Sequence, residues 1–318
     1  NSNQTITDLV SAGLLTEPRL TEAAGRLLTE QFKLGLFENP YVDAGLVEAM
    51  VGKDAHRAKG LTVQKQSVVL LSNSVTEGST RLLPLASNLK VYTMGMGKAD
   101  VESHGYTVTD GNYTTPGTRP SAEGHDVAVI RVQVSNPLSA TAAYRSKGAT
   151  TGADPTRLNS RTGQVWGAED PCITHAAQNP TCVDDLGLIF GGALPWEAGE
   201  LSLTAMAASQ SWRISPSLAD IQAVMSEVGA KNTVLAIYFR QPYVLDEASG
   251  VRDAGALVAT FGVSDAALMD VLTGKFKPQG KLPFALANKL QAVKDNEPDA
   301  PGYPEADTLY PYGFGLTY

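Results

Sequence analysis

The sequence has no excess of basic side chains and no long apolar run. Lys and Arg number 25 against 33 Asp and Glu, so the 318 residues carry a formal net charge of −8. This balance argues against nucleic acid or an anionic membrane surface as the main partner. The longest apolar runs, at 127–134 and 233–239, have the length of strands and fall far short of the roughly 20 residues that cross a membrane. We therefore expect a folded protein that binds neither nucleic acid nor a membrane.

Cysteine is scarce. Cys172 and Cys182 are the only two, and they lie ten positions apart in a stretch without apolar periodicity. A disulfide between them would contribute about 2.5–3 kcal/mol in the chain-entropy model. It would favour an oxidising setting, either secreted or periplasmic. The alternative is two unrelated free thiols. Only His175 lies near the pair, which makes a poor zinc site, and we expect no metal.

The chain also lacks an initiator Met, and its first residues show neither a basic segment nor an apolar core of a signal peptide. We expect a processed or cut N-terminus.

Apolar spacing predicts helices first and a sheet afterwards. Helical spacing covers 5–34, with a start signal at Thr16-Glu17-Pro18 and an end at Gly35, and a further helix is predicted over 54–66. Beyond these, buried strands are predicted at 89–94, 127–134, 233–239 and 256–261, and helices at 217–228 and 264–273. Apolar runs alternating with amphipathic helices are typical of a mostly parallel sheet covered on both faces. The expected fold is a three-layer α/β/α sandwich.

Residues 135–200 have no sustained period and are rich in Ser, Thr, Gly, Ala, Asn and Pro. This segment leaves the carboxyl end of strand 127–134, where α/β sheets bind ligands. A loop of this length inside a compact domain is either functional or disordered. The turn Gly95-Met96-Gly97 lacks the third glycine and the helix of a dinucleotide-binding motif, so no nucleotide cofactor is expected.

Four strings resemble glycoside hydrolase family 3. Residues 32–41 resemble the segment that closes the barrel domain of that family, and 55–85 resemble the opening of the sandwich domain that follows it. The strings at 265–284 and 310–318 resemble later parts of the same sandwich domain. They occur in the family's order and cover nearly the whole chain. Their glycines, prolines and tyrosines indicate structural roles: a helix cap at Gly274, a strand at Leu282 and packed tail aromatics.

The resemblance implies a retaining, exo-acting hydrolase of β-linked sugars, most often a β-glucosidase. It assigns 1–45 to the last helices and linker of a (β/α)8 barrel, and 46–318 to the sandwich domain. The family's nucleophile is an Asp on the barrel, so a barrel domain or chain outside these residues is the expected partner. The substrate is a β-linked glycoside, and the mechanism requires no cofactor.

The family's acid/base Glu commonly follows the strand matching 127–134, but here that strand runs into Ser135-Asn136-Pro137. The candidates are therefore Glu197, and less strongly Glu169 and Glu200. Trp196 and Trp166 offer flat faces for a sugar ring, and an adjacent indole can raise the pKa of a Glu through desolvation. Arg240 follows strand 233–239, where it either lines the site mouth or pairs with Asp246 or Glu247. The missing Glu also favours a non-catalytic carbohydrate-binding or assembly module.

Overall fold

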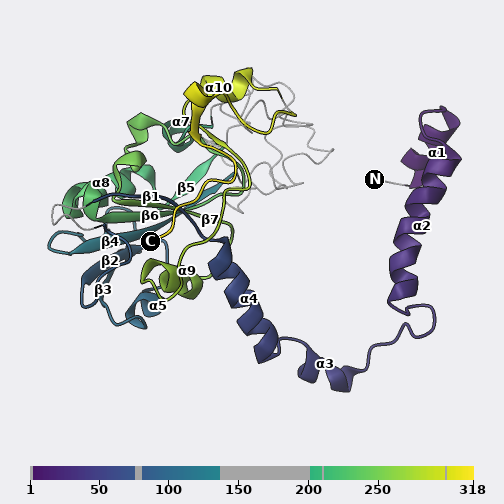
Figure 1. The fold of residues 1–318 in the computed structure, drawn as a ribbon, viewed down its shortest axis with the longest axis horizontal. Helices are drawn as coiled ribbons and strands as arrows, with labels where there is room; N and C mark the ends of the chain where they lie inside the picture. The colour runs from purple at the N-terminus through teal and green to yellow at the C-terminus, as the bar shows by residue number, and fades with distance from the viewer. Residues whose placement is uncertain (1–2, 76–80, 137–200, 210, 298) are drawn as a thin grey trace. The chain divides into compact units, whose positions relative to one another are not determined.

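A computed structural model describes residues 3–75, 81–136, 201–209, 211–297 and 299–318. The chain forms two compact units, 1–58 and 59–318 (Figure 1). In the described ranges, no helix has the length and apolar character needed to span a membrane. The expected domain boundary at residue 45 stays a prediction.

The first unit is helical. It contains α1 (Asn3–Ser11), α2 (Glu17–Lys33) and α3 (Ala44–Met50), and α4 (Asp54–Ser67) begins within it. Thr16 caps α2, since its hydroxyl accepts a hydrogen bond from the Arg19 amide at 3.4 Å. Just after α2, Gly35 adopts a φ of +67°. The predicted start, end and second helix are confirmed.

The second unit is built on one mixed sheet. Its strands are β1 (Val69–Asn73), β2 (Lys90–Met94), β3 (Thr107–Asp110), β4 (Val127–Ser135), β5 (Arg213–Ser215), β6 (Thr233–Tyr238) and β7 (Ala256–Thr260). The order is β1-β7-β6-β4-β2-β3, with β5 beside β4. Strands β2, β3, β4, β6 and β7 run parallel, whereas β1 and β5 are antiparallel to their neighbours. Every predicted strand of the sheet is therefore present, and the mostly parallel arrangement is confirmed.

Helices cover both faces of the sheet. They are α5 (Lys98–Glu102), α7 (Leu203–Ala208), α8 (Leu218–Val228), α9 (Asp265–Leu272) and α10 (Leu290–Asp295), with short 3-10 turns at Ala230–Asn232, Glu247–Ser249, Val251–Asp253 and Glu305–Asp307. Figure 1 shows α7 and α8 on one side and α5 and α9 on the other.

The side chains of β4 divide between the two cores, as the period of two in a strand requires. Ile130 packs in the core under α8, and Val129 packs in the core under α9. This confirms the three-layer α/β/α sandwich.

The C-terminal segment closes the sandwich. Rings of Tyr310 and Phe314 lie 5.0 Å apart, and the Tyr318 hydroxyl donates to the carbonyl of Val271. Gly274 follows α9 with a φ of +76°, as expected for a helix cap. These outcomes confirm the structural roles predicted for the tail motifs.

The strand predicted at Leu282 is wrong. The strand in this region is β8 (Leu286–Ala287), which pairs with β9 (Thr308–Tyr310). Pro283 has no amide hydrogen and cannot continue a ladder. Leu282 instead donates its amide to Phe314 and accepts from Gly313, both at 2.9 Å.

Candidate functional site at the carboxyl edge of the sheet

The sheet reverses its strand order between β2 and β4. Because β3 lies on one side of β2 and β4 on the other, the crevice between β2 and β4 is the switch point at which α/β sheets bind ligands. The turn 95–97 follows β2 there. Gly95 has a φ of +75°, and a Cβ at this position would overlap the carbonyl oxygen of Arg131. Glycine is therefore needed for close approach of two backbones.

The amides of this turn already have protein acceptors. Gly95 donates to Oδ1 of Asn112 at 2.8 Å, and Gly97 donates to Oδ2 of Asp265 at 2.8 Å. Asp265 also pairs with Arg131, whose guanidinium reaches the carbonyl of Val263. These bonds fix the loops after β2 and β7 against β4, so the turn serves packing.

Both ends of the segment 137–200 leave from the same edge. Asn136 directly follows β4, and the chain returns at Leu201, whose carbonyl accepts from the Val244 amide at 3.0 Å. Val244 lies beyond the carboxyl end of the parallel strand β6. The predicted residues Glu169, Glu197, Glu200, Trp166 and Trp196 lie outside the described residues, as do Cys172 and Cys182.

Arg240 lies two residues beyond β6, at this edge. It is exposed, and its guanidinium carbon lies 5.7 Å from the centre of the Tyr238 ring. Asp246, considered as its partner, is used elsewhere, since its carboxylate accepts from the amides of Thr204 at 3.0 Å and Ser249 at 3.1 Å. The Arg240 head group therefore lies on an aromatic face at the mouth of the carboxyl edge.

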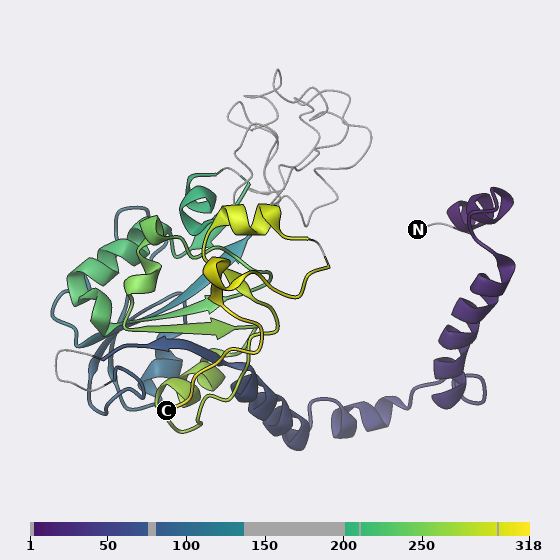
Figure 2. The ribbon, with the colours of Figure 1, turned by 45° about the horizontal axis from the view of Figure 1, so that its top comes forward.

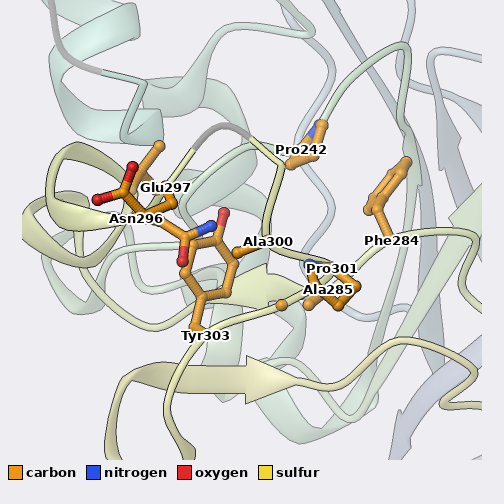
Figure 3. Close-up of a pocket in the computed structure, with 10 residues that line it drawn as sticks. Pro242, Phe284, Ala285, Asn296, Glu297, Ala300, Pro301 and Tyr303 are labelled. Atoms are coloured by element: carbon orange, nitrogen blue, oxygen red, sulfur yellow. The ribbon is translucent and has the colours of Figure 1, made fainter.

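Sequence reasoning missed the cavities near this edge, one of which, of about 540 Å³, is lined by Ser202, Val244 and Asp246 among others. Two others are smaller. One, of about 280 Å³, lies between Pro242 and the segment 284–303 (Figure 3). The other, of about 250 Å³, lies at the switch point and is lined by Asn112, Tyr113 and Asp220. In Figure 2 the arrowheads of the parallel strands point towards the side on which the yellow segment after α10 lies. For the cavity beside Pro242, the only sequence feature that marks the lining segment is the high content of Pro, Asp and Tyr in residues 289–318.

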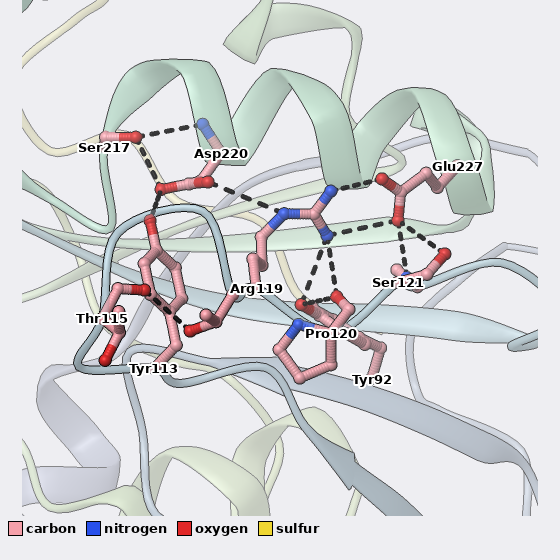
Figure 4. Close-up of polar contacts among 11 residues, drawn as sticks. Tyr92, Tyr113, Thr115, Arg119, Pro120, Ser121, Ser217, Asp220 and Glu227 are labelled. Carbon is pink, nitrogen blue, oxygen red and sulfur yellow. Dashed lines mark hydrogen bonds and ion pairs between the residues drawn. The ribbon is translucent and has the colours of Figure 1, made fainter.

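A polar cluster borders the switch-point cavity (Figure 4). The Tyr113 hydroxyl donates to Oδ2 of Asp220 at 2.7 Å, and this bond raises the pKa of Tyr113. Arg119 pairs with Glu227 and donates to the carbonyl of Pro120 at 3.0 Å. The hydrogen bond from Arg119 lowers the pKa of Glu227. The charged groups of this cluster are thus paired within the protein, which indicates a structural role.

The described carboxyl groups with shifted pKa values do not suit a general acid. Burial raises the pKa of Asp270, but hydrogen bonds from His104 and Lys65 outweigh it and leave the pKa lowered. The pKa of Glu227 is lowered as well. A general acid at neutral pH needs a raised pKa. In the part of the chain that the structure describes, no group of three His, Cys, Asp or Glu side chains is arranged to hold a metal ion.

Known proteins with similar sequences belong to one family of hydrolases. The family model "Glycosyl hydrolase family 3 C-terminal domain" matches residues 68–318. The chain is 27% identical over 316 residues to "Beta-glucosidase C" of Emericella nidulans, covering 98% of this chain and 38% of that protein. It is 28% identical over 309 residues to "Periplasmic beta-glucosidase/beta-xylosidase" of Dickeya chrysanthemi, covering 97% of this chain and 36% of that protein.

Solved structures agree in fold. A β-glucosidase from Listeria innocua in complex with glucose has a TM-score of 0.51 at 17% identity, with 98% of this chain and 40% of that chain covered. A β-glucosidase from Erythrobacter marinus has a TM-score of 0.55 at 19% identity, with 98% and 42% covered. The chain thus spans about two fifths of the length of these relatives. The resemblance carried by the four sequence strings is confirmed, and the chain belongs to glycosyl hydrolase family 3, with residues 68–318 matching its C-terminal domain.

Proposed function

We propose that this chain is the sandwich-domain part of a retaining, exo-acting β-glycosidase that removes terminal β-linked glucose or a similar sugar. One observation carries the proposal: the chain aligns over 97–98% of its length with β-glucosidases, yet spans only 36–38% of theirs. The chain supplies one wall of the cleft, built on the carboxyl edge of the sheet. A (β/α)8 barrel domain or chain supplies the Asp nucleophile, and this chain alone is inactive.

The retaining mechanism divides the chemistry between two carboxyl groups about 5–5.5 Å apart. The nucleophile attacks the anomeric carbon, and the acid/base protonates the leaving oxygen and later activates water. We assign the acid/base to the segment between Asn136 and Leu201, with Glu197 ahead of Glu169 and Glu200. Trp196 and Trp166 offer faces for the sugar rings, and Arg240 stands at the mouth. No metal or organic cofactor takes part.

Two features support this assignment. Both ends of the segment are held at the carboxyl edge, so its residues start from the place where α/β sheets bind ligands. The described carboxyl groups with shifted pKa values, Glu227 and Asp270, have values shifted in the wrong direction for an acid. Neither Glu227 nor Asp270 therefore competes with the glutamates of the segment for this role.

A second function is a carbohydrate-binding or assembly module without catalysis. The end of β4 favours it, because neither Ser135, its last residue, nor Asn136, which follows it, carries a carboxylate. Like the hydrolase, such a module requires a sugar-binding surface, but it requires no general acid.

The complete protein that contains these residues should hydrolyse both 4-nitrophenyl β-glucoside and cellobiose, releasing β-glucose first in a proton NMR time course. Glu197→Gln should slow cellobiose hydrolysis by about a hundredfold or more, because general acid catalysis contributes about 10²–10⁴-fold. It should slow nitrophenyl glucoside less, since nitrophenolate leaves without protonation.

The matched control is Glu102→Gln on α5, at an exposed side chain. If glutamine at 169, 197 and 200 each leaves cellobiose hydrolysis intact, none of these three glutamates is the acid. If the complete protein hydrolyses no β-glycoside but binds one, the module is the correct function.

We place the protein outside the cytoplasm, secreted or periplasmic. The relatives from Dickeya chrysanthemi and Salmonella typhimurium are named periplasmic. We propose a disulfide between Cys172 and Cys182, so intact mass after thiol alkylation without reduction should show no alkylated cysteine. Two alkylated cysteines would contradict the bridge.

A further inference from the structure

His104 is a buried histidine that joins two helices. It lies just after α5, and its side chain is only 6% exposed. Its Nδ1 lies 2.8 Å from the carbonyl oxygen of Asp100, and its Nε2 lies 3.0 Å from Oδ1 of Asp270 on α9. Helices α5 and α9 contact each other on one face of the sheet (Figure 1). The imidazole therefore bridges the end of α5 to α9.

Both partners of this ring accept hydrogen bonds and donate none. A carbonyl oxygen carries no proton. Burial opposes ionisation of Asp270, but hydrogen bonds from His104 and Lys65 outweigh it and hold the pKa of this carboxyl below its usual range. The Ser103 hydroxyl also lies 3.2 Å from Nδ1, but it donates to the Asp100 carbonyl at 2.8 Å.

A neutral imidazole has one N–H group and serves only one of two acceptors. Its bare nitrogen would then face either the Asp100 carbonyl or the Asp270 carboxylate at hydrogen-bond distance, in a site that excludes most water. A doubly protonated ring donates to both. The geometry at His104 therefore requires the positively charged form of the ring.

His125 provides a contrast within the same chain. Its Nδ1 lies 2.9 Å from the carbonyl oxygen of Ala122, and its Nε2 lies 2.8 Å from Oγ1 of Thr109. A threonine hydroxyl donates as well as accepts. A neutral His125 can therefore donate from Nδ1 and accept at Nε2, so it keeps both contacts without a second proton.

Asp270 extends the contact of His104 to a third helix. Its Oδ2 accepts from Nζ of Lys65 at 3.0 Å, and the Asp270 and Lys65 side chains are 22% and 18% exposed. Lys65 belongs to the last turn of α4, the helix through which the chain enters the second compact unit. We call His104, Asp270 and Lys65 the clamp, because one carboxylate holds the ends of α5 and α4 to α9.

The charged groups that face the ring are Asp270 on α9 and, beyond it, Lys65 on α4. The other charged side chains of α5 and of the start of α9 are placed elsewhere: Lys98 with Glu102, Asp265 with Arg131, and the Asp100 carboxylate near Gly97. The charge of the ring is thus balanced by one carboxylate, which it shares with Lys65.

We propose that His104 is a proton-dependent switch: its doubly protonated ring closes the clamp, and loss of one ring proton weakens the attachment of α5 to α9. The switch does not depend on the proposed hydrolase. An unfolded histidine gives up its second proton near pH 6.5, whereas the clamp retains it. The stabilisation by the clamp is therefore complete below about pH 6.5 and is lost as the pH rises above that value.

The first test is solid-state nitrogen-15 NMR of the 318-residue chain labelled at histidine, which works equally well on an associated chain. His104→Gln and His125→Gln assign the signals. At pH 7.0 both ring nitrogens of His104 should give the shifts of N–H groups, whereas Nε2 of His125, the matched control, should give the shift of a bare nitrogen. A bare ring nitrogen in His104 at this pH would overturn the proposal.

The second test is urea denaturation at pH 6.0 and pH 9.0. His104→Gln should lower the urea midpoint at pH 6.0, and at least half of this loss should be gone at pH 9.0. The loss caused by His125→Gln should be the same at both values. An equal loss for His104→Gln at pH 6.0 and 9.0 would reject the switch. If His104→Gln does not fold, Asp270→Asn replaces it, and in that variant His104 should show one bare nitrogen at pH 7.0. Two N–H groups there would also reject the switch.

Discussion

Arg119 and Glu227 form a two-point ion pair that joins the loop after β3 to helix α8. Nη1 of Arg119 donates to Oε2 of Glu227 at 3.2 Å, and Nη2 donates to Oε1. The two side chains are only 15% and 20% exposed. Glu227 also accepts from the Ala122 amide, so one carboxylate holds both ends of the loop segment 119–122. This pairing fixes one wall of the switch-point crevice. Removing the pair should therefore lower the stability of the fold.

Glu227→Gln should lower the free energy of unfolding by about 2 kcal/mol, because it removes the two-point partner of a partly buried guanidinium and leaves it only the longer contact with Asp220, at 3.6 Å. Urea denaturation measures this change. The control is Glu102→Gln, which removes an i,i+4 pair with Lys98 whose side chains are 44% and 46% exposed. That pair should contribute less than about 0.5 kcal/mol. Equal losses in the two variants would contradict a special role for the Arg119 pair.

The same pair should make stability depend on pH in the acid range. The hydrogen bond from Arg119 holds the pKa of Glu227 below its usual range, so the folded state binds this proton less readily than the unfolded chain. The stabilisation is complete above the ordinary Glu pKa of about 4.3 and is lost as pH falls through the lower value of the folded state. The stability difference between wild type and Glu227→Gln should therefore shrink below about pH 4. A constant difference down to pH 3 would reject this linkage.

Local signals in the sequence were sufficient for the elements of the sheet and their covering helices. The apolar runs of β4 and β6 are uninterrupted, whereas a strand with one exposed face alternates apolar and polar residues. They are also too short to span a membrane, so they predict buried strands. Ser217 and Ser264 start α8 and α9, and their hydroxyls accept from the amides of Asp220 at 3.1 Å and Ala267 at 3.3 Å. Such caps act within one turn, so they are visible in the sequence.

The candidate site was less accessible to sequence reasoning because its parts meet only in the fold. Arg119 and Glu227 are 108 positions apart, and no periodicity links them. Pro242 and Tyr303 are likewise far apart in the sequence and line one cavity only in the folded chain. The edge strand β3 was missed because its short polar sequence has no apolar run, and it is held by β2 alone.

Two glycines of the closing segment should not tolerate a side chain. A Cβ on Gly280 would meet the carbonyl of Val68, and one on Gly315 would meet the carbonyl of Gly280. Because backbone atoms cannot move aside as a side chain can, Gly315→Ala should cost about 1–3 kcal/mol, measured by urea denaturation. The control is Gly60→Ala in α4, where a Cβ meets no atom within 4 Å. Gly60→Ala should raise the free energy of unfolding by up to about 1 kcal/mol, because alanine has a higher helix propensity than glycine. A loss of stability in both variants, or a gain in both, would contradict the argument.

The helices of residues 3–50 do not bury their apolar side chains within their own unit. None of their residues is buried: Leu27 in α2 is 71% exposed, and Leu34, which directly follows α2, is 72% exposed. Apolar surface of this kind normally faces another protein surface, and the proposed barrel is the partner it fits. The isolated chain should therefore self-associate and bind the dye ANS, whereas a variant beginning at Lys53, which keeps α4 whole, should be monomeric and bind little dye. Light scattering after size exclusion separates the two states. If both chains are monomeric with equal dye binding, the helices need no partner, and the argument for a companion domain on this surface fails.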